Sequence, residues 1–345
     1  MKAAVLTGIR SIEIREVPEP AMRGGDDVLL SVNVVGVCGS DMHYYRTGRI
    51  GQQVVKFPWL VGHEAAGTVL KVGPGAGDLR PGQRVAIEPL VACGRCDQCL
   101  AGRRHTCRKQ VFLGVPDQLA GCLAERLVMP GRCCLPIPDG MTMDQAALVE
   151  PFAIGLYAQR RFGRPKGQNI AILGSGPIGL CVLSVLKAAG PCKVYVTDLL
   201  DGRLSVAARC GADWTLNAAG RDAVAAIGDL CPLGVDCVFE CAGKQETLDQ
   251  AARLLTPGGT LVMVGIPAGD RVSFDMNYLR RRELTLLNIR RQNECVRPAI
   301  EMLAGGQVNL DALVTHRFRL DQAQQAFDLV ADYRDGVVKA MIDVQ

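Results

Sequence analysis

The segment NIAILGSGPIG, residues 169–179, places Gly174, Gly176 and Gly179 directly after a short apolar run and directly before a helical pattern. Glycines at this spacing permit a tight turn, let the backbone approach a pyrophosphate and allow close helix packing, while the helix N-terminus offers amide groups and a positive dipole end. Glycine-rich turns are common, so the spacing alone identifies no nucleotide site. The context adds specificity, because the next apolar run, KVYVTD, ends in an acidic residue, Asp198.

Asp198 is the expected ribose ligand of a dinucleotide. A carboxylate at this point can bind both ribose hydroxyls of NAD and repels the 2′-phosphate of NADP. Arg203, a little further on, could accommodate such a phosphate, which weakens the preference. The alternative is that Asp198 only caps the helix that follows, and the two roles are compatible. We expect NAD as the cofactor.

Two kinds of sequence pattern divide the chain. From about residue 153 to 290, apolar strands buried on both faces alternate with helical stretches, which is typical of a doubly wound parallel sheet. Up to about residue 150, short strands are broken by glycine and proline, and DDVLLSVNVVG alternates as a half-buried strand does. The predicted fold class is α/β, with a β-rich domain and a Rossmann domain. The pattern after residue 290 fits either closure of the Rossmann sheet or a return to the first domain.

Composition restricts the functional classes. The chain has 345 residues, enough for two domains, and its net charge of +4 is too small to indicate nucleic acid or a membrane surface as a partner. The N-terminal segment does not resemble a signal peptide, and the longest apolar runs are shorter than a membrane span needs. We expect a cytoplasmic protein that binds no nucleic acid and no membrane. Fifteen cysteines, an odd number, argue against a disulfide framework.

Four clustered cysteines predict a metal site. The run LVACGRCDQCLAGRRHTC holds Cys93, Cys96, Cys99 and Cys107, a ligand set and spacing that suit tetrahedral zinc. Four protein ligands leave no position for water or substrate, so we expect this zinc to be structural. Free surface thiols are the alternative, but they would be prone to oxidation and need no regular spacing. His105 lies in the same loop and could replace one cysteine.

A second set of ligand-type residues is scattered through the first 150 positions: Cys38, His63, Glu64 and Glu150. No spacing rule joins them, and a lone cysteine or histidine is more often packed than ligating. An open zinc site nevertheless needs only three protein ligands plus a water, and cysteine, histidine and carboxylate are suitable types. From the residues alone, two interpretations stay open: a catalytic metal site, or side chains that are only packed in the interior.

The order of these motifs resembles that of a known family. CGSDMH, GHEAAG, PGQRVAIEP, the cysteine cluster, the EP pair at 150–151 and GSGPIG occur in the order found in zinc-dependent medium-chain dehydrogenases/reductases. The resemblance covers the whole chain, and CGSDMHYYRTGRIG, GHEAAGTV, RVAIEP and LVTHRF are most similar to the sorbitol (polyol) dehydrogenase branch. It implies a GroES-like catalytic domain formed by residues 1–152 and 291–345. A Rossmann NAD-binding domain, residues 153–290, would be inserted between these two segments.

The resemblance implies a catalytic zinc site. Cys38, His63 and Glu64 match the zinc ligands of the polyol branch, with water in the fourth place. Glu150 matches a carboxylate that contacts this water or the substrate, and that can take a turn as a ligand. Whether Glu64 or Glu150 is the third protein ligand at rest is left open. With the four-cysteine site, the implied metal content is two zinc ions per subunit.

Further roles follow from the same resemblance. Ser40 and His43 match the proton relay of alcohol dehydrogenases. Besides Glu150, the residues implied on the substrate side are Tyr44, Phe112 and Arg291. Two positions depart from animal sorbitol dehydrogenases, where a tyrosine replaces Gln292 and a threonine replaces Val115. The residues implied in cofactor binding are Gly174, Gly176, Pro177, Ile178, Gly179, Asp198, Arg203, Val264, Gly265, Ile266, Ile289 and Arg290.

The implied activity is zinc-dependent hydride transfer from a secondary alcohol of a polyol or sugar-derived substrate to NAD, giving a ketose or other keto product. Enzymes with the same machinery are alternatives: a sugar-acid (aldonate) 5-dehydrogenase, a threonine dehydrogenase or a simple alcohol dehydrogenase. Arg291 and its neighbouring arginines would suit a carboxylate or phosphate. A non-enzymatic binding or structural descendant is the remaining alternative. Relatives are commonly dimers or tetramers, so we expect a homo-oligomer, such as a homotetramer.

Overall fold

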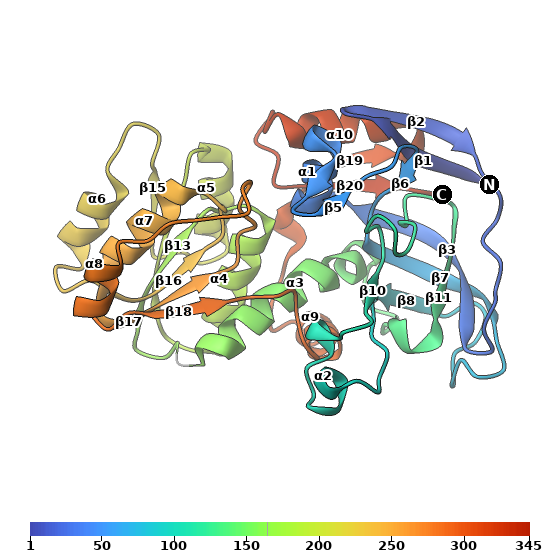
Figure 1. The fold of residues 1–345 in the computed structure, drawn as a ribbon, viewed down its shortest axis with the longest axis horizontal. Coiled ribbons are helices and arrows are strands. Elements are labelled where there is room, and N and C mark those ends of the chain that lie inside the picture. The colour runs from blue at the N-terminus through green and yellow to red at the C-terminus, as the bar shows by residue number, and fades with distance from the viewer. Residues whose placement is uncertain (164) are drawn as a thin grey trace. The chain divides into compact units, whose positions relative to one another are not determined.

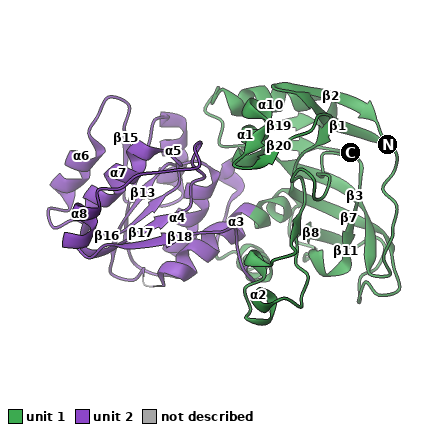
Figure 2. Cartoon of the chain, in the orientation of Figure 1, with its two compact units in different colours: residues 1–150, 296–307, 314–345 green, residues 151–295, 308–313 purple. Residues whose placement is uncertain are grey.

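The computed structural model describes residues 1–163 and 165–345, which form two compact units (Figure 2). Unit 1 comprises Met1–Glu150, Val296–Gln307 and Val314–Gln345, and unit 2 comprises Pro151–Cys295 and Val308–Leu313. The predicted domain boundaries fall after residues 152 and 290, whereas the units divide after residues 150 and 295. The assignment of a separate role to each domain stays a prediction.

Unit 2 is built on a six-stranded sheet in which every neighbouring pair is parallel (Figure 1). The spatial order β15-β14-β13-β16-β17-β18 is the order 3-2-1-4-5-6 of a Rossmann fold. The prediction of a doubly wound parallel sheet is confirmed. The strands are β13 (Asn169–Leu173), β14 (Lys193–Asp198), β15 (Trp214–Asn217), β16 (Val235–Glu240), β17 (Leu255–Met263) and β18 (Thr285–Asn288).

Helices follow the strands of unit 2 as the sequence pattern predicts. The central strand β13 is buried over four of its five residues, because a parallel sheet is covered on both faces. The helix after it begins with Pro177 at its first turn, where a missing N–H costs nothing. The helices are α4 (Pro177–Ala189), α5 (Asp201–Arg209), α6 (Ala223–Leu230), α7 (Gln245–Leu254) and α8 (Met276–Arg281).

Unit 1 is built on a sheet with the strand order β12-β8-β7-β3-β20-β19, and β11 also pairs with β3. The C-terminal strand β20 pairs antiparallel with β3, so the end of the chain returns to the sheet of the N-terminal region. This pairing resolves the two alternatives that periodicity left open. The strands are β3 (Asp27–Gly36), β7 (Glu64–Val72), β8 (Arg84–Ile87), β11 (Arg126–Pro130), β12 (Cys134–Pro136), β19 (Val314–Arg319) and β20 (Lys339–Asp343).

One apolar core joins the N-terminal and C-terminal parts of unit 1. Phe327 of the C-terminal helix packs edge-on against Tyr45 of the first helix, with ring centroids 5.4 Å apart. The helices of this unit are α1 (Gly39–Thr47), α2 (Asp97–Leu100), α9 (Val296–Ala304) and α10 (Ala323–Ala331). The smaller strands are β1 (Lys2–Gly8), β2 (Ser11–Glu16), β4 (Arg49–Ile50), β5 (Gln53–Val54), β6 (Trp59–Leu60), β9 (Leu90–Val91) and β10 (Val111–Phe112).

The helix α3 (Met143–Phe162) carries Glu150 at the point where the chain passes from unit 1 to unit 2. Single 3-10 turns complete the described chain: η1 (Arg104–Thr106), η2 (Gly131–Cys133), η3 (Asp311–Leu313) and η4 (Leu320–Gln322). Among residues 1–163 and 165–345, no helix combines the length and apolar character needed to cross a membrane.

Candidate active site and metal centres

Cys38, His63 and Glu64 come together at the meeting ends of two neighbouring strands. Gly36, the last residue of β3, pairs with Glu64, the first residue of β7. Cys38 follows β3 and is the N-cap residue of α1, while His63 directly precedes β7. One potential ligand atom from each of the three residues lies within 4.8 Å of the other two. The antiparallel pairing thus unites residues that no sequence spacing connects.

The environment of these side chains suits a cation. Burial raises the pKa of the Cys38 thiol, and the Glu64 carboxylate raises it further. Burial lowers the pKa of His63, but Asp41 and Cys38 outweigh it and raise this pKa well above the ordinary value of 6.5. Glu64 Oε1 is buried and has no hydrogen-bond partner among the described residues. A sulfur, an imidazole nitrogen and a carboxylate oxygen are the donors that zinc accepts, so the three residues fit a zinc ion.

Asp41 supports two members of this cluster, and the sequence interpretation missed it. Its Oδ1 lies 3.5 Å from Nδ1 of His63, and its Oδ2 accepts the backbone N–H of Cys38 at 3.2 Å. A carboxylate on the second ring nitrogen of a metal-ligating histidine fixes the ring orientation and raises the basicity of the ligand. Asp41 lies inside the CGSDMH motif, three residues after Cys38. Its place in this motif is the signal that could have identified it.

Ser40 lies against the cluster, and His43 lies further along the same helix α1. Ser40 Oγ donates to Cys38 Sγ at 3.3 Å and lies 3.4 Å from His63 Nε2. Burial, followed by the positive charge of Arg46, lowers the pKa of His43 below its ordinary value of 6.5. His43 is therefore uncharged at neutral pH and able to accept a proton.

The predicted substrate residues are distributed over both units. Tyr44 is buried and its hydroxyl donates to Gln53 Oε1 at 3.2 Å. The Phe112 ring is also buried, and its centroid lies 5.6 Å from that of His63. Glu150 is buried and is the last residue of the first segment of unit 1, whereas Arg291 belongs to unit 2.

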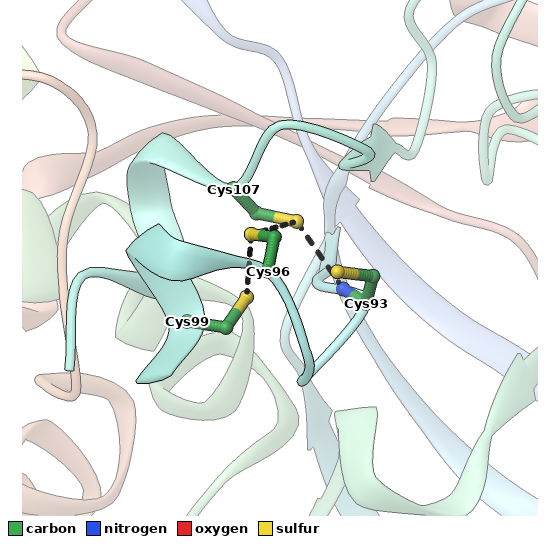
Figure 3. A group of neighbouring side chains, drawn as sticks. All are labelled: Cys93, Cys96, Cys99 and Cys107. Carbon is green, nitrogen blue, oxygen red and sulfur yellow. Dashed lines mark hydrogen bonds between the residues drawn. The ribbon is translucent and has the colours of Figure 1, made fainter. Parts of the chain in front are cut away.

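The four clustered cysteines form a separate group on a loop of unit 1 (Figure 3). The sulfur of Cys96 lies 3.6 Å from that of Cys99 and 3.9 Å from that of Cys107. Cys107 Sγ also accepts the backbone N–H groups of Cys93 and Lys109. Backbone N–H groups of Arg108 and Cys99 lower the pKa of Cys96 to about 6, which favours the thiolate that zinc binds. Four converging sulfurs fit a closed tetrahedral zinc site.

The glycine-rich segment of unit 2 has the close backbone contacts expected of a nucleotide-binding turn. Gly174 has a φ of +101°, which favours glycine, and it directly follows β13. A side chain at Gly179 would place its Cβ 2.0 Å from the carbonyl oxygen of Gly174, so only glycine fits there. Gly176 is the N-cap residue of α4, and a Cβ there would lie 3.5 Å from the Arg203 guanidinium. The turn joins β13 to the N-terminus of α4, as the sequence predicts.

The other predicted cofactor residues follow the carboxyl ends of the strands, the edge at which open parallel sheets bind ligands. Asp198 ends β14, and its carboxylate accepts the backbone N–H groups of Ser175 at 2.7 Å, Leu199 at 2.8 Å and Leu200 at 3.1 Å. Pro177 and Ile178 begin α4, and Arg203 lies in α5. Val264, Gly265 and Ile266 follow β17, while Ile289 and Arg290 follow β18.

Two family models match the chain in succession. Residues 24–139 match the alcohol dehydrogenase GroES-like domain, and residues 177–305 match the zinc-binding dehydrogenase domain. The chain belongs to the zinc-binding dehydrogenase family. The predicted family, the fold class with its GroES-like and Rossmann domains, and the enzyme class of alcohol or polyol oxidoreductases are confirmed.

Individual relatives of this dehydrogenase cover almost its whole length. A sorbitol dehydrogenase of Bacillus subtilis is 37% identical over 99% of this chain and 97% of its own. An L-idonate 5-dehydrogenase of Vitis vinifera is 33% identical over 95% of this chain and 91% of its own. The solved structure of a zinc-binding dehydrogenase from Sinorhizobium meliloti, bound to NADP, is 32% identical with a TM-score of 0.90, covering 99% of each chain.

Proposed function

We propose that this dehydrogenase is a zinc-dependent polyol dehydrogenase that oxidises a secondary alcohol of a polyol or sugar-derived substrate to the ketone. The observation that carries the proposal is the cluster of Cys38, His63 and Glu64, three ligands of different chemistry with an unpartnered carboxylate oxygen among the described residues. Three protein ligands leave a coordination position for substrate, unlike the four-cysteine group. The 37% identity to a sorbitol dehydrogenase supports the substrate class.

In this mechanism Cys38, His63 and Glu64 would hold the catalytic zinc, and Asp41 orients two of them. Zinc, when bound, supplies the Lewis acidity that lowers the pKa of an alcohol, and a nicotinamide, when bound, supplies the hydride acceptor. The proton of the alcohol passes to Ser40 and then to His43, whose lowered pKa keeps it ready to accept. Glu150 is a second proposed acceptor for this proton, because it matches a carboxylate that contacts the zinc-bound water in the family that this chain resembles, and it is buried in unit 1.

We assign the four cysteines Cys93, Cys96, Cys99 and Cys107 to a second, structural zinc ion. Their sulfurs supply a complete tetrahedral set, which supports a total of two zinc ions per subunit. Elemental analysis of the purified protein tests this count. Two zinc ions per chain support the assignment, and one ion that is lost from a Cys38→Ser variant contradicts the structural site.

The proposed nicotinamide cofactor is NAD. Asp198 ends the strand next to β13 and supports this choice, because a carboxylate there binds ribose hydroxyls and repels a 2′-phosphate. The relative from Sinorhizobium meliloti binds NADP, and Arg203 lies near the glycine-rich turn, so NADP is the second candidate. The ratio of kcat/KM for the two cofactors distinguishes them.

A sugar acid is the second candidate for the substrate. The L-idonate 5-dehydrogenase relative and the arginines Arg290 and Arg291 favour it, since a guanidinium pairs with a carboxylate. Rates of nicotinamide reduction with sorbitol, xylitol, L-idonate, threonine and a simple secondary alcohol test the choice. The proposal expects the highest kcat/KM for a neutral polyol, and a preference for L-idonate overturns this part of it.

We also propose the oligomeric state, the cellular location and the domain roles of the protein. We expect a homo-oligomer, a dimer or a homotetramer, because relatives of this type commonly assemble, and we expect it to be cytoplasmic. The domain roles that we propose are catalysis for residues 1–152 with 291–345 and NAD binding for residues 153–290. Sedimentation of the purified full-length chain tests the oligomer, and a monomer at micromolar concentration contradicts it.

A further inference from the structure

Lys339 is a buried lysine that the proposed mechanism does not use. Its side chain is 1% exposed, and its ammonium donates to Glu64 Oε2 at 2.6 Å and to the carbonyl oxygen of Val37 at 3.1 Å. Glu64 is equally buried, with a side chain that is 1% exposed. Buried charges are costly to desolvate and persist when they are paired and hydrogen-bonded, so this ion pair requires a structural or functional reason.

Three adjacent strands converge on this pair. Lys339 begins β20, Glu64 begins β7, and Gly36 ends β3, which lies between the other two in the sheet. A Cβ at Gly36 would lie 2.4 Å from Glu64 Oε2, so the absence of a side chain there lets the carboxylate sit against the backbone. The position of Oε2 is thus fixed by contacts with Gly36 of β3 and Lys339 of β20.

The two oxygens of the Glu64 carboxylate have different surroundings. Oε2 receives the ammonium of Lys339, whereas Oε1 is buried with no hydrogen-bond partner among the described residues. A Glu64 oxygen lies within 4.8 Å of the donor atoms of Cys38 and His63. A carboxylate that gives only one oxygen to a metal is expected to have this arrangement, with a cationic partner at one oxygen and no partner at the other.

We propose that Lys339 is a positioning residue that occupies one oxygen of Glu64 and so limits this ligand to a single oxygen at the catalytic metal. The inference rests on the proposed function, in which Glu64 is a zinc ligand. If both oxygens turned to the metal, the second would fill a coordination position that an open site keeps for water or substrate. By holding Oε2 of Glu64, Lys339 keeps that coordination position open.

Cobalt(II) provides a readout that is independent of turnover. The metal at the Cys38 cluster is removed with a mild chelator and replaced by cobalt, whose ligand-field absorption bands weaken as the coordination number rises. We expect Lys339→Met to weaken these bands relative to the wild type. Lys339→Arg keeps the charge and is expected to restore them. Lys187→Met, which removes a lysine 2.9 Å from Asp213 in unit 2, is the matched control and should leave the bands unchanged.

A double-substitution cycle tests whether Lys339 acts through Glu64. In a Glu64→Gln background, adding Lys339→Met should leave the cobalt spectrum unchanged, because no carboxylate remains to reorient. A spectrum that changes in this background overturns the proposal, as does a Lys339→Met spectrum identical to that of the wild type. If the single Lys339→Met variant does not fold, Lys339→Gln replaces it, because a polar side chain is less costly beside the buried Glu64 carboxylate, and it should weaken the bands in the same way.

Cys38→Ser separates the failure of this inference from the failure of the proposed function. It should abolish the thiolate-to-cobalt charge-transfer band of the cluster. If the band persists, cobalt is not bound at Cys38, and both proposals are wrong. If the band disappears but Lys339→Met matches the wild type, only the role of Lys339 is wrong.

Discussion

Asp41 Oδ1 lies 3.5 Å from Nδ1 of His63, and both side chains are almost completely buried. The contact leaves Nε2 of His63 on the side of Ser40, whose hydroxyl oxygen lies 3.4 Å away. Because Asp41 also accepts the backbone N–H of Cys38, one carboxylate orients two of the three proposed ligands. The proposed metal site would therefore depend on a residue that need not touch the metal.

Replacement of Asp41 tests this dependence. Asp41→Asn keeps the shape of the side chain but removes its charge, so we expect zinc affinity at the Cys38 cluster to fall roughly 10- to 100-fold. Competition with a chromophoric chelator measures the affinity. The matched control is Asp335→Asn, which alters an exposed pair in which Asp335 lies 3.2 Å from His316. Equal affinities of Asp41→Asn and the wild type would contradict the orienting role.

The two cysteine-containing sites should respond differently to substitution. Cys96→Ser removes a ligand of the closed site, and we expect a loss of stability on the order of 4 kcal/mol because a structural metal is lost. Cys38→Ser should leave the melting temperature close to that of the wild type and abolish turnover. Thermal unfolding and initial rates measure the two effects. Cys96→Ser protein that melts like the wild type but has no activity would reverse the assignment.

The sequence singled out the residues that we propose as metal ligands, but not the residues that contact and orient them. Cys38, His63 and the four clustered cysteines belong to motifs whose residue types carry metal chemistry. Asp41 lies in the same motif, yet an aspartate in the first turn of a helix is also a common helix-stabilising residue. Lys339 lies 275 positions from Glu64, and only the pairing of β20 with β3 brings the two together. Long-range strand pairing is what a local pattern cannot contain.

The fold of unit 2 could be predicted because its repeating pattern is local in sequence. Each strand–helix repeat is local in sequence, and the burial of strands such as β13 and β16 on both faces makes their apolar runs easy to recognise. The chain after residue 290 lacks this repeat. Most of this part, Val296–Gln307 and Val314–Gln345, belongs to unit 1, where β20 pairs antiparallel with β3 and places Ile342 opposite Val35.

The pH dependence of turnover tests the proton acceptor. Burial and Arg46 lower the pKa of His43, so the neutral form persists below pH 6.5 and the acid limb of kcat/KM should lie below that value. Arg46→Gln removes a positive charge that disfavours protonation, and the limb should move to higher pH. Because the pKa is lowered on folding, the contribution of His43 to stability is present above its unfolded pKa and is lost as the pH falls through 6.5 toward the folded pKa.

A neighbouring arginine controls for changes in net charge. Arg49→Gln removes an exposed charge from the same region and should leave the acid limb in place. If Arg46→Gln and Arg49→Gln give the same profile as the wild type, another group accepts the proton. Glu150 would then be the residue to examine.

Asp198→Ala tests the choice of cofactor. Removal of a charged hydrogen-bond acceptor for the ribose should raise KM for NAD roughly 10- to 100-fold, which corresponds to about 1.5–3 kcal/mol. KM for NADP should rise less or fall, because the repulsion of a 2′-phosphate is removed. Steady-state kinetics with both cofactors measures the ratio. An equal loss for both would mean that Asp198 only organises the backbone N–H groups of Ser175, Leu199 and Leu200.

The most direct test of the proposed function is the rate of NAD reduction with sorbitol before and after removal of the metal at Cys38, His63 and Glu64. A mild chelator should remove this ion first, because the four-cysteine site is closed by its own ligands. We expect the rate to fall in proportion to the zinc lost and to return when zinc is restored to the folded protein. A rate that does not change when this zinc is removed would contradict it.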